Sequence, residues 1–249
     1  MKILALDSSG IVASVAIVQE DVLLAEYTVN YKKTHSQTLL PMLDEVARMT
    51  ELDLTEIDAI ATAAGPGSFT GLRIGSATAK GLGLALQKPL IAVPTVEALA
   101  YNLYDTKGLV CPIMDARRNQ VYTGIYRYEG HRLVTVKTQT AMAVDELLDE
   151  LNTLGEEVTF LGDGVPVFKA AIEEKLKVPS SFAPPRWRLL GFSIIKKERY
   201  RLPRNTNPII CGFLRQSGSV PRGKSCDGQR NAGGRPVPGN GNRNRAVWR

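Results

Sequence analysis

The stretch Ala63-Ala64-Gly65-Pro66-Gly67-Ser68-Phe69-Thr70-Gly71-Leu72-Arg73 joins a short apolar segment to a segment with helical periodicity. A glycine loop between a buried strand and a helix presents backbone N–H groups at the helix N-terminus, where an anion is favoured. The spacing differs from the Walker A and dinucleotide-binding loops, because it reads Gly-x-Gly-x-x-x-Gly. The loop predicts an α/β fold, and two interpretations stay open: a phosphate site, or a tight turn that lets strand and helix pack closely.

Strand and helix patterns alternate on both sides of this loop. The first half predicts strands at 3–6, 13–18 and 22–29, a helix at 36–49, a strand at 57–63, a helix at 72–86, a strand at 89–93 and a helix at 95–104. The second half predicts strands at 109–114, 120–128 and 133–137, a helix at 144–151, a strand at 158–161 and a helix at 165–176. Both halves begin with strands and end with helices, so the sequence predicts two α/β lobes, 1–106 and 107–180, each a mixed sheet with helices.

The charge of the chain is unevenly distributed. Its 249 residues carry a formal net charge of +6, but residues 181–249 hold 15 Lys and Arg against 2 acidic residues, whereas residues 1–180 hold 16 against 23. The basic segment is rich in Gly, Pro, Asn and Arg and shows no apolar periodicity, which predicts a disordered or frame-shifted tail rather than part of a core. A cationic RNA-binding tail is the alternative interpretation. The net charge alone is therefore no evidence for nucleic acid binding.

The apolar runs and the cysteines limit the class of protein. No apolar run approaches the roughly 20 residues that cross a bilayer, and the 3 cysteines show no close pairing. We expect a cytoplasmic protein without membrane contact or disulfide framework.

Polar side chains directly after the first strand form a second candidate site. Asp7, Ser8 and Ser9 suit contact with a phosphate or a metal ion, although turn-forming residues between paired strands are the simpler interpretation. Together with the glycine loop, the candidate nucleotide- or phosphate-binding residues are Asp7, Ser8, Ser9, Gly65, Gly67, Ser68 and Thr70.

The turn Asp115-Ala116-Arg117-Arg118 occupies the corresponding place in the second half. Its two arginines suit an anion or the carboxylates of a partner, and an exposed hairpin turn is the alternative. Catalytic and metal-binding residues are not predicted: the only histidines are His35 and His131, in different halves, and Cys111 lies in an apolar strand typical of a core.

The helix after the glycine loop carries small residues at four-residue spacing: Gly71, Gly75, Ala79 and Gly83, with Ala77, Gly81 and Ala85 on a second stripe. A glycine inside a helix costs about 1 kcal/mol relative to alanine, so these glycines indicate a close packing partner. The partner is either within the lobe or a helix of another subunit, for which the apolar residues Leu39, Leu43 and Val46 are a plausible companion.

Five segments in order resemble the TsaB (YeaZ) family: Ile3-Leu4-Ala5-Leu6-Asp7-Ser8-Ser9, His35-Ser36-Gln37-Thr38-Leu39-Leu40-Pro41, the stretch from Gly65 to Gly75, Ala92-Val93-Pro94-Thr95 and Met114-Asp115-Ala116-Arg117. The resemblance covers residues 1 to about 185, after which the family's final helix is replaced by the basic segment. It implies the two-lobed fold of actin, Hsp70 and sugar kinases (the ASKHA fold). It also implies the family's role as non-catalytic partner in making the threonylcarbamoyl modification of the adenosine beside the tRNA anticodon.

The same resemblance implies a scaffold rather than an enzyme. The sister family TsaD carries two metal-binding histidines four residues apart on the third helix, and Thr95 and Leu99 stand at those positions here. The implied partners are a TsaD-like catalytic subunit, a TsaE-like ATPase, tRNA through the complex, and a second copy of the chain when the catalytic subunit is absent. The implied interface consists of Leu39, Leu43, Val46, Leu72, Gly75, Ala79 and Gly83. No cofactor is assigned to this chain, and ATP or ADP with Mg at the complex is left open.

Two alternatives to the scaffold follow from the residues. One is an active ATP-dependent phosphotransferase or ATPase of the same fold, which would use Asp7, Ser9 and the glycine loop. The other is an RNA-binding protein that acts through its basic tail.

Overall fold

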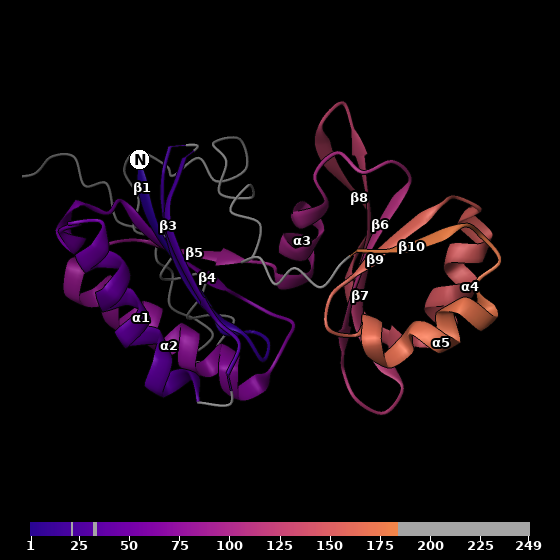
Figure 1. Cartoon of the computed structure of the whole chain (residues 1–249), viewed down its shortest axis with the longest axis horizontal. Helices are drawn as coiled ribbons and strands as arrows, with labels where there is room; N and C mark the ends of the chain where they lie inside the picture. The colour runs from indigo at the N-terminus through magenta and orange to yellow at the C-terminus, as the bar shows by residue number, and fades with distance from the viewer. Residues whose placement is uncertain (21, 32–33, 184–249) are drawn as a thin grey trace, which may run out of the picture.

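Two five-stranded sheets, one in each lobe, organise the chain (Figure 1). The computed structural model describes residues 1–20, 22–31 and 34–183. The strand order is β3-β2-β1-β4-β5 in the first sheet and β8-β7-β6-β9-β10 in the second. In both sheets the first three strands are antiparallel, and the last two lie parallel to the first strand. The predicted duplication of a mixed α/β sheet is therefore confirmed.

The first lobe contains five strands and two long helices: β1 (Lys2–Asp7), β2 (Ala13–Gln19), β3 (Val22–Val29), α1 (His35–Met49), the short η1 (Leu54–Glu56), β4 (Ala59–Ala63), α2 (Phe69–Leu86) and β5 (Leu90–Val93). The central strands are apolar on both sides because both faces of the sheet are covered, and all five residues of β4 are buried. Pro41 lies inside α1, in its second turn, where it has no N–H to donate to the carbonyl oxygen of Gln37.

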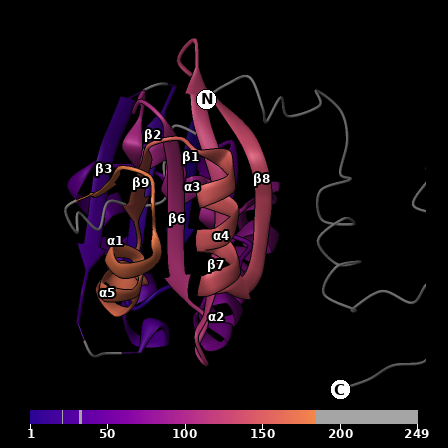
Figure 2. The same cartoon turned by 90° about the vertical axis from the view of Figure 1, so that its right-hand side faces the viewer.

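The second lobe repeats this plan with longer outer strands: β6 (Leu109–Asp115), β7 (Gln120–Glu129), β8 (Arg132–Ala143), α4 (Val144–Leu154), β9 (Val158–Leu161), α5 (Val165–Lys175) and β10 (Ser180–Phe182). Helices α4 and α5 cover the outer face of the second sheet (Figure 2). Gly155 ends α4 in the left-handed conformation (φ 69°), which glycine adopts without steric cost.

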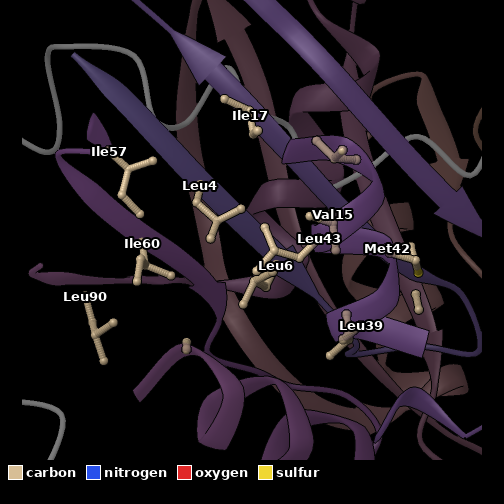
Figure 3. Close-up of a cluster of buried hydrophobic side chains, with 13 residues drawn as sticks. Leu4, Leu6, Val15, Ile17, Leu39, Met42, Leu43, Ile57, Ile60 and Leu90 are labelled. Atoms are coloured by element: carbon tan, nitrogen blue, oxygen red, sulfur yellow. The ribbon is translucent and has the colours of Figure 1, made fainter. Parts of the chain in front are cut away.

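Helices α1 and α2 cover one face of the first sheet and close its larger core (Figures 1 and 3). The strand residues Leu4, Leu6, Val15 and Ile17 lie in one buried cluster with Leu39, Met42 and Leu43 of α1. Burying one such side chain contributes about 1.5–3 kcal/mol. This cluster therefore fixes α1 and α2 against the sheet.

Helix α3 (Thr95–Ala100), followed by the short η2 (Tyr101–Leu103), lies between the two sheets (Figure 1). Ala98 packs into the apolar cluster of the first sheet. Val96 and Ala100, on the same short helix, pack into a cluster with Val110 and Tyr126 of the second sheet. The two lobes are therefore joined through one helix that is buried on both sides.

Several element boundaries differ from those predicted: the helix predicted at 95–104 is α3, which ends at Ala100 and is followed by η2. Three further differences have a clear physical reason. Helix α2 begins at Phe69 rather than Leu72 because the hydroxyl of Ser68 accepts a hydrogen bond from the N–H of Gly71 and caps the helix. Strand β8 extends to Ala143, well beyond 133–137, because it pairs with β7 along its whole length.

The third difference concerns the start of the basic segment. The sequence predicts that Ser181 and Phe182 belong to the tail, but they pair with Thr159 and Phe160 of β9 and form part of the second sheet. The predictions for the tail beyond Ala183 lie outside the described residues. Among the residues that the structure describes, no helix is long and apolar enough to span a membrane.

The two small-residue stripes of α2 give a stability test. A Cβ at Gly71 would lie 2.0 Å from the carbonyl oxygen of Ser8, whereas a Cβ at Gly81 would meet no atom within 4 Å. We expect Gly71→Ala to destabilise the fold by about 2 kcal/mol or more through overpacking. Gly81→Ala should stabilise it by about 1 kcal/mol through helix propensity. Urea unfolding of both variants measures the difference, and equal shifts of the two midpoints would contradict the assigned helix orientation.

Candidate functional site

The glycine loop, residues 65–68, packs directly on the turn between β1 and β2. The N–H of Ser68 donates to the carbonyl oxygen of Ser9 at 2.6 Å, and a Cβ at Gly67 would lie 2.4 Å from that oxygen. The N–H of Gly71 is engaged by the Ser68 hydroxyl. Two of the N–H groups that could have faced a phosphate, those of Ser68 and Gly71, are thus used within the lobe. The residues of this loop fit close packing of strand and helix better than a bound nucleotide.

The polar residues after β1 are also engaged within the lobe. Ser8 and Ser9 are buried, and the Ser8 hydroxyl donates to the carbonyl oxygen of Gly71 at 2.8 Å. A carboxylate oxygen of Asp7 accepts the N–H of Ser9 at 2.8 Å. Burial raises the pKa of the Asp7 carboxyl above its ordinary value, although the Ser9 hydrogen bonds and the nearby His35 act in the opposite direction. These polar groups of the turn are therefore used in hydrogen bonds within the first lobe.

His35 connects this turn to the first turn of α1. Its Nε2 donates to the carbonyl oxygen of Gly10 at 2.9 Å, because a carbonyl oxygen can only accept. Its other ring nitrogen, Nδ1, is buried and has no hydrogen-bond partner among the described residues. His35 is the first residue of α1, one residue before the predicted start, and its ring anchors that helix to the β1–β2 turn.

A side chain of the second lobe reaches the glycine loop. Gln139 of β8 donates from Nε2 to the carbonyl oxygen of Gly65 at 3.1 Å, and its Oε1 accepts the N–H of Val96 at 3.3 Å. Thr95 donates its own N–H to the same Gly65 oxygen at 2.9 Å. One amide group thus links β8, the glycine loop and the first turn of α3. No sequence pattern indicates the role of this residue, because the role depends on how the two lobes meet.

The second lobe repeats the turn after its first strand. A carboxylate oxygen of Asp115 accepts the N–H of Arg117 at 2.8 Å, as Asp7 does with Ser9. Across from it, Asp163 lies in the loop after β9, and burial together with the charge of Asp115 raises its pKa. Within the described ranges, no group of three or more His, Cys, Asp or Glu side chains has the arrangement of a metal site.

Cys111 and the residues of α3 are placed as core residues. The Cys111 thiol is fully buried, and burial raises its pKa to about 12, so it stays protonated at neutral pH and is a poor nucleophile. Thr95 is buried at the start of α3, and Leu99 packs partly buried against the second-lobe cluster.

The residues predicted to meet a partner face the interior of their own lobe. Leu39, Leu43 and Val46 of α1 belong to the buried core, and Leu72 packs partly buried against the other face of the first sheet. On α2, the whole stripe formed by Gly71, Gly75, Ala79 and Gly83 is buried. Gly75 lies against Ser8 and Gly83 lies against Leu90. The predicted interface residues therefore pack within their own lobe, because the first small-residue stripe allows α2 to approach its own sheet. Their contact with a partner stays a prediction.

The opposite side of the two helices is exposed and partly apolar. We use the name outer α1–α2 face for the exposed surface of the two helices, which includes the second small-residue stripe of α2 and four large exposed side chains: Ala77, Gly81, Ala85, Leu40 (53% exposed), Met49 (70%), Phe69 (68%) and Leu84 (82%). The guanidinium carbon of Arg73 lies 3.9 Å from the centre of the Phe69 ring and leaves that ring largely exposed.

The duplicated sheets, the shared helix between them and the two aspartate turns define a protein of the two-lobed ASKHA-like class. Two solved structures have this fold. One is YeaZ from Pseudomonas aeruginosa, with a TM-score of 0.65 and 24% identity over 88% of this chain and 95% of that chain. The other is a protein from the same organism described as similar to peptidase YEAZ, with a TM-score of 0.66 and 24% identity over 87% of this chain and 93% of that chain.

Sequence comparisons identify the family. The model of TsaD, tRNA N6-adenosine threonylcarbamoyltransferase, matches residues 22–196. The tRNA threonylcarbamoyladenosine biosynthesis protein TsaB of Bacillus subtilis is 38% identical over 71% of this chain and 77% of its own length, and that of Escherichia coli is 32% identical over 66% and 72%. The chain belongs to the TsaB family, and its role lies in tRNA threonylcarbamoyladenosine biosynthesis.

The Gln139 bridge generates a prediction about how the lobes are coupled. Gln139→Ala removes one donor and one acceptor and leaves the Val96 N–H without this partner, so we expect a loss of stability of about 1–3 kcal/mol. Hydrogen exchange should become faster at both Val96 and the glycine loop. Thr140→Ala, at a neighbouring position of β8 with a hydroxyl hydrogen-bonded only within the strand, is the matched control. Exchange that rises only within β8 would contradict the bridge.

Proposed function

We propose that this chain is a non-catalytic scaffold that binds a TsaD-like catalytic subunit through the outer α1–α2 face. The family's role in tRNA threonylcarbamoyladenosine biosynthesis is the starting point. We add two points to this role: the chain binds the catalytic subunit, and it catalyses no reaction itself.

A non-catalytic role is supported because the groups that could do chemistry are hydrogen-bonded within the lobe or buried. The hydroxyl of Ser8, the backbone of Ser9 and the N–H of Ser68 are all used in packing the glycine loop on the first turn. Thr95 and Leu99 stand where the resemblance implies paired metal-binding histidines in TsaD, and neither side chain can replace an imidazole. The thiol of Cys111 is buried and protonated.

Binding through the outer α1–α2 face is supported chiefly by Gly81. A glycine in a helix interior costs about 1 kcal/mol relative to alanine, and the inward glycines of α2 offset this cost by close packing. Gly81 has nothing within 4 Å, so no contact within the described lobe requires it. A helix of another subunit that approaches between Ala77, Gly81 and Ala85 would explain it, with Leu84 and Phe69 as apolar anchors.

The rest of the assembly follows from this interface. We propose that a second copy of the chain occupies the same face when the catalytic subunit is absent, since a two-fold pairing needs only one self-complementary patch. The TsaE-like ATPase and tRNA then join through the complex, in the cytoplasm, where tRNA is modified. No nucleotide is assigned to this chain.

The interface is tested by substituting its most exposed anchor. Leu84→Asp places a charge on the outer α1–α2 face, and we expect at least a tenfold loss of affinity for the TsaD protein of the same organism, measured by isothermal titration calorimetry. Gly81→Trp should have a similar effect by blocking the approach of a helix.

Val167→Asp is the control, because Val167 is an apolar residue that is 57% exposed on α5 of the other lobe. Circular dichroism checks that each variant is folded. Unchanged affinity of both outer-face variants, or an equal loss in the control, would refute the proposed interface.

A further inference from the structure

The turn between β6 and β7 presents two arginines without a partner. Arg117 and Arg118 are exposed, and in the described part of the chain no ion pair or side-chain hydrogen bond involves either guanidinium group. The neighbouring Asp115 accepts the turn's own N–H, and the raised pKa of Asp163 is set by burial and by Asp115. Both positive charges are therefore available to a ligand.

The backbone of this turn has an unusual conformation. Arg117, Arg118 and Asn119 have φ angles of 68°, 52° and 61°, so three successive non-glycine residues adopt the left-handed conformation. Each such residue costs about 1 kcal/mol and persists only where surrounding bonds fix it. Here the N–H of Gln120 donates to Arg117, and the N–H of Val144 donates to Asn119. The backbone of the turn that carries the two arginines is thus held by these hydrogen bonds.

The corresponding turn of the first lobe serves a different purpose. Ser8 and Ser9 are buried under α2 and the glycine loop. The second-lobe turn makes no comparable contact through its arginines, although the same aspartate bond closes it. Burial under α2 and the glycine loop accounts for the residues of the first turn. No such contact accounts for the two exposed arginines of the second turn.

The chemistry of the turn fits a phosphate backbone better than a protein surface. Four consecutive exposed residues, Arg117, Arg118, Asn119 and Gln120, all carry hydrogen-bond donors, and none is apolar or acidic. Protein interfaces have apolar anchors at their centre, as the outer α1–α2 face does. Guanidinium groups instead match phosphate oxygens, and such contacts position nucleic acid without reading its sequence.

We propose that Arg117 and Arg118 bind the phosphate backbone of the tRNA on which the family acts. The contact is made by the second lobe and is independent of the α1–α2 interface. It places RNA directly on the described part of this chain rather than only on its partners.

The salt dependence of tRNA binding tests this proposal. The full-length chain is titrated with unmodified tRNA at several salt concentrations, and the variant Arg117→Gln/Arg118→Gln removes both charges while keeping long polar side chains. Each lost phosphate contact lowers the slope of log K against log salt by about one, so we expect a decrease of about two and roughly tenfold weaker binding at 0.1 M salt. Contributions of the basic tail are common to all variants and cancel in the comparison.

Lys107→Ala/Lys169→Ala removes two charges from other exposed sites and is the control. Arg117→Lys/Arg118→Lys should keep the slope and lose only part of the affinity. A slope equal to that of the control would overturn the proposal. Unchanged tRNA binding together with weaker binding of the TsaD protein would also overturn it, in favour of partner carboxylates, whereas loss of the α1–α2 interface alone would leave it standing.

Discussion

The close approach of α2 to the turn after β1 is the contact on which the rest of the first lobe depends. Gly71 and Gly75 bring the helix so near to Ser8 that a single Cβ at either position would collide with it. This contact fixes the rotation of α2, and the rotation decides which small-residue stripe is buried. It also occupies the glycine loop, so a feature typical of ligand binding serves here to pack a strand, a turn and a helix together.

The two lobes preserve the same sheet while their turns have diverged. Strand order, strand direction and the bond from an aspartate to the residue two positions later recur in both halves. In the first lobe the turn is buried, and in the second it projects into solvent with two arginines. Duplication therefore supplied two equivalent sites on one scaffold, and each could take a different role without disturbing the shared sheet.

The sequence predicted the elements well and the orientation of side chains less well. Apolar periodicity located the strands and long helices because each element buries one face or both. Periodicity could not decide which small-residue stripe of α2 is buried, Gly71-Gly75-Ala79-Gly83 or Ala77-Gly81-Ala85. Both consist of small residues, and the buried stripe is set by contacts with Ser8 and Leu90. Gln139 was not predicted at all, since a polar residue in an outer strand gains its role only from the other lobe.

The double burial of α3 has a consequence for folding. This six-residue helix belongs to the first half of the sequence, yet Val96 and Ala100 complete the apolar cluster of the second sheet, while Ala98 completes that of the first. The second half produced alone would leave one face of its sheet open to water, and the first half produced alone would expose Val96 and Ala100. We therefore expect that a cut at the sequence boundary near residue 106 does not yield two autonomous folding units. We also expect both lobes to unfold cooperatively, because the short helix α3 is part of the apolar clusters of both sheets.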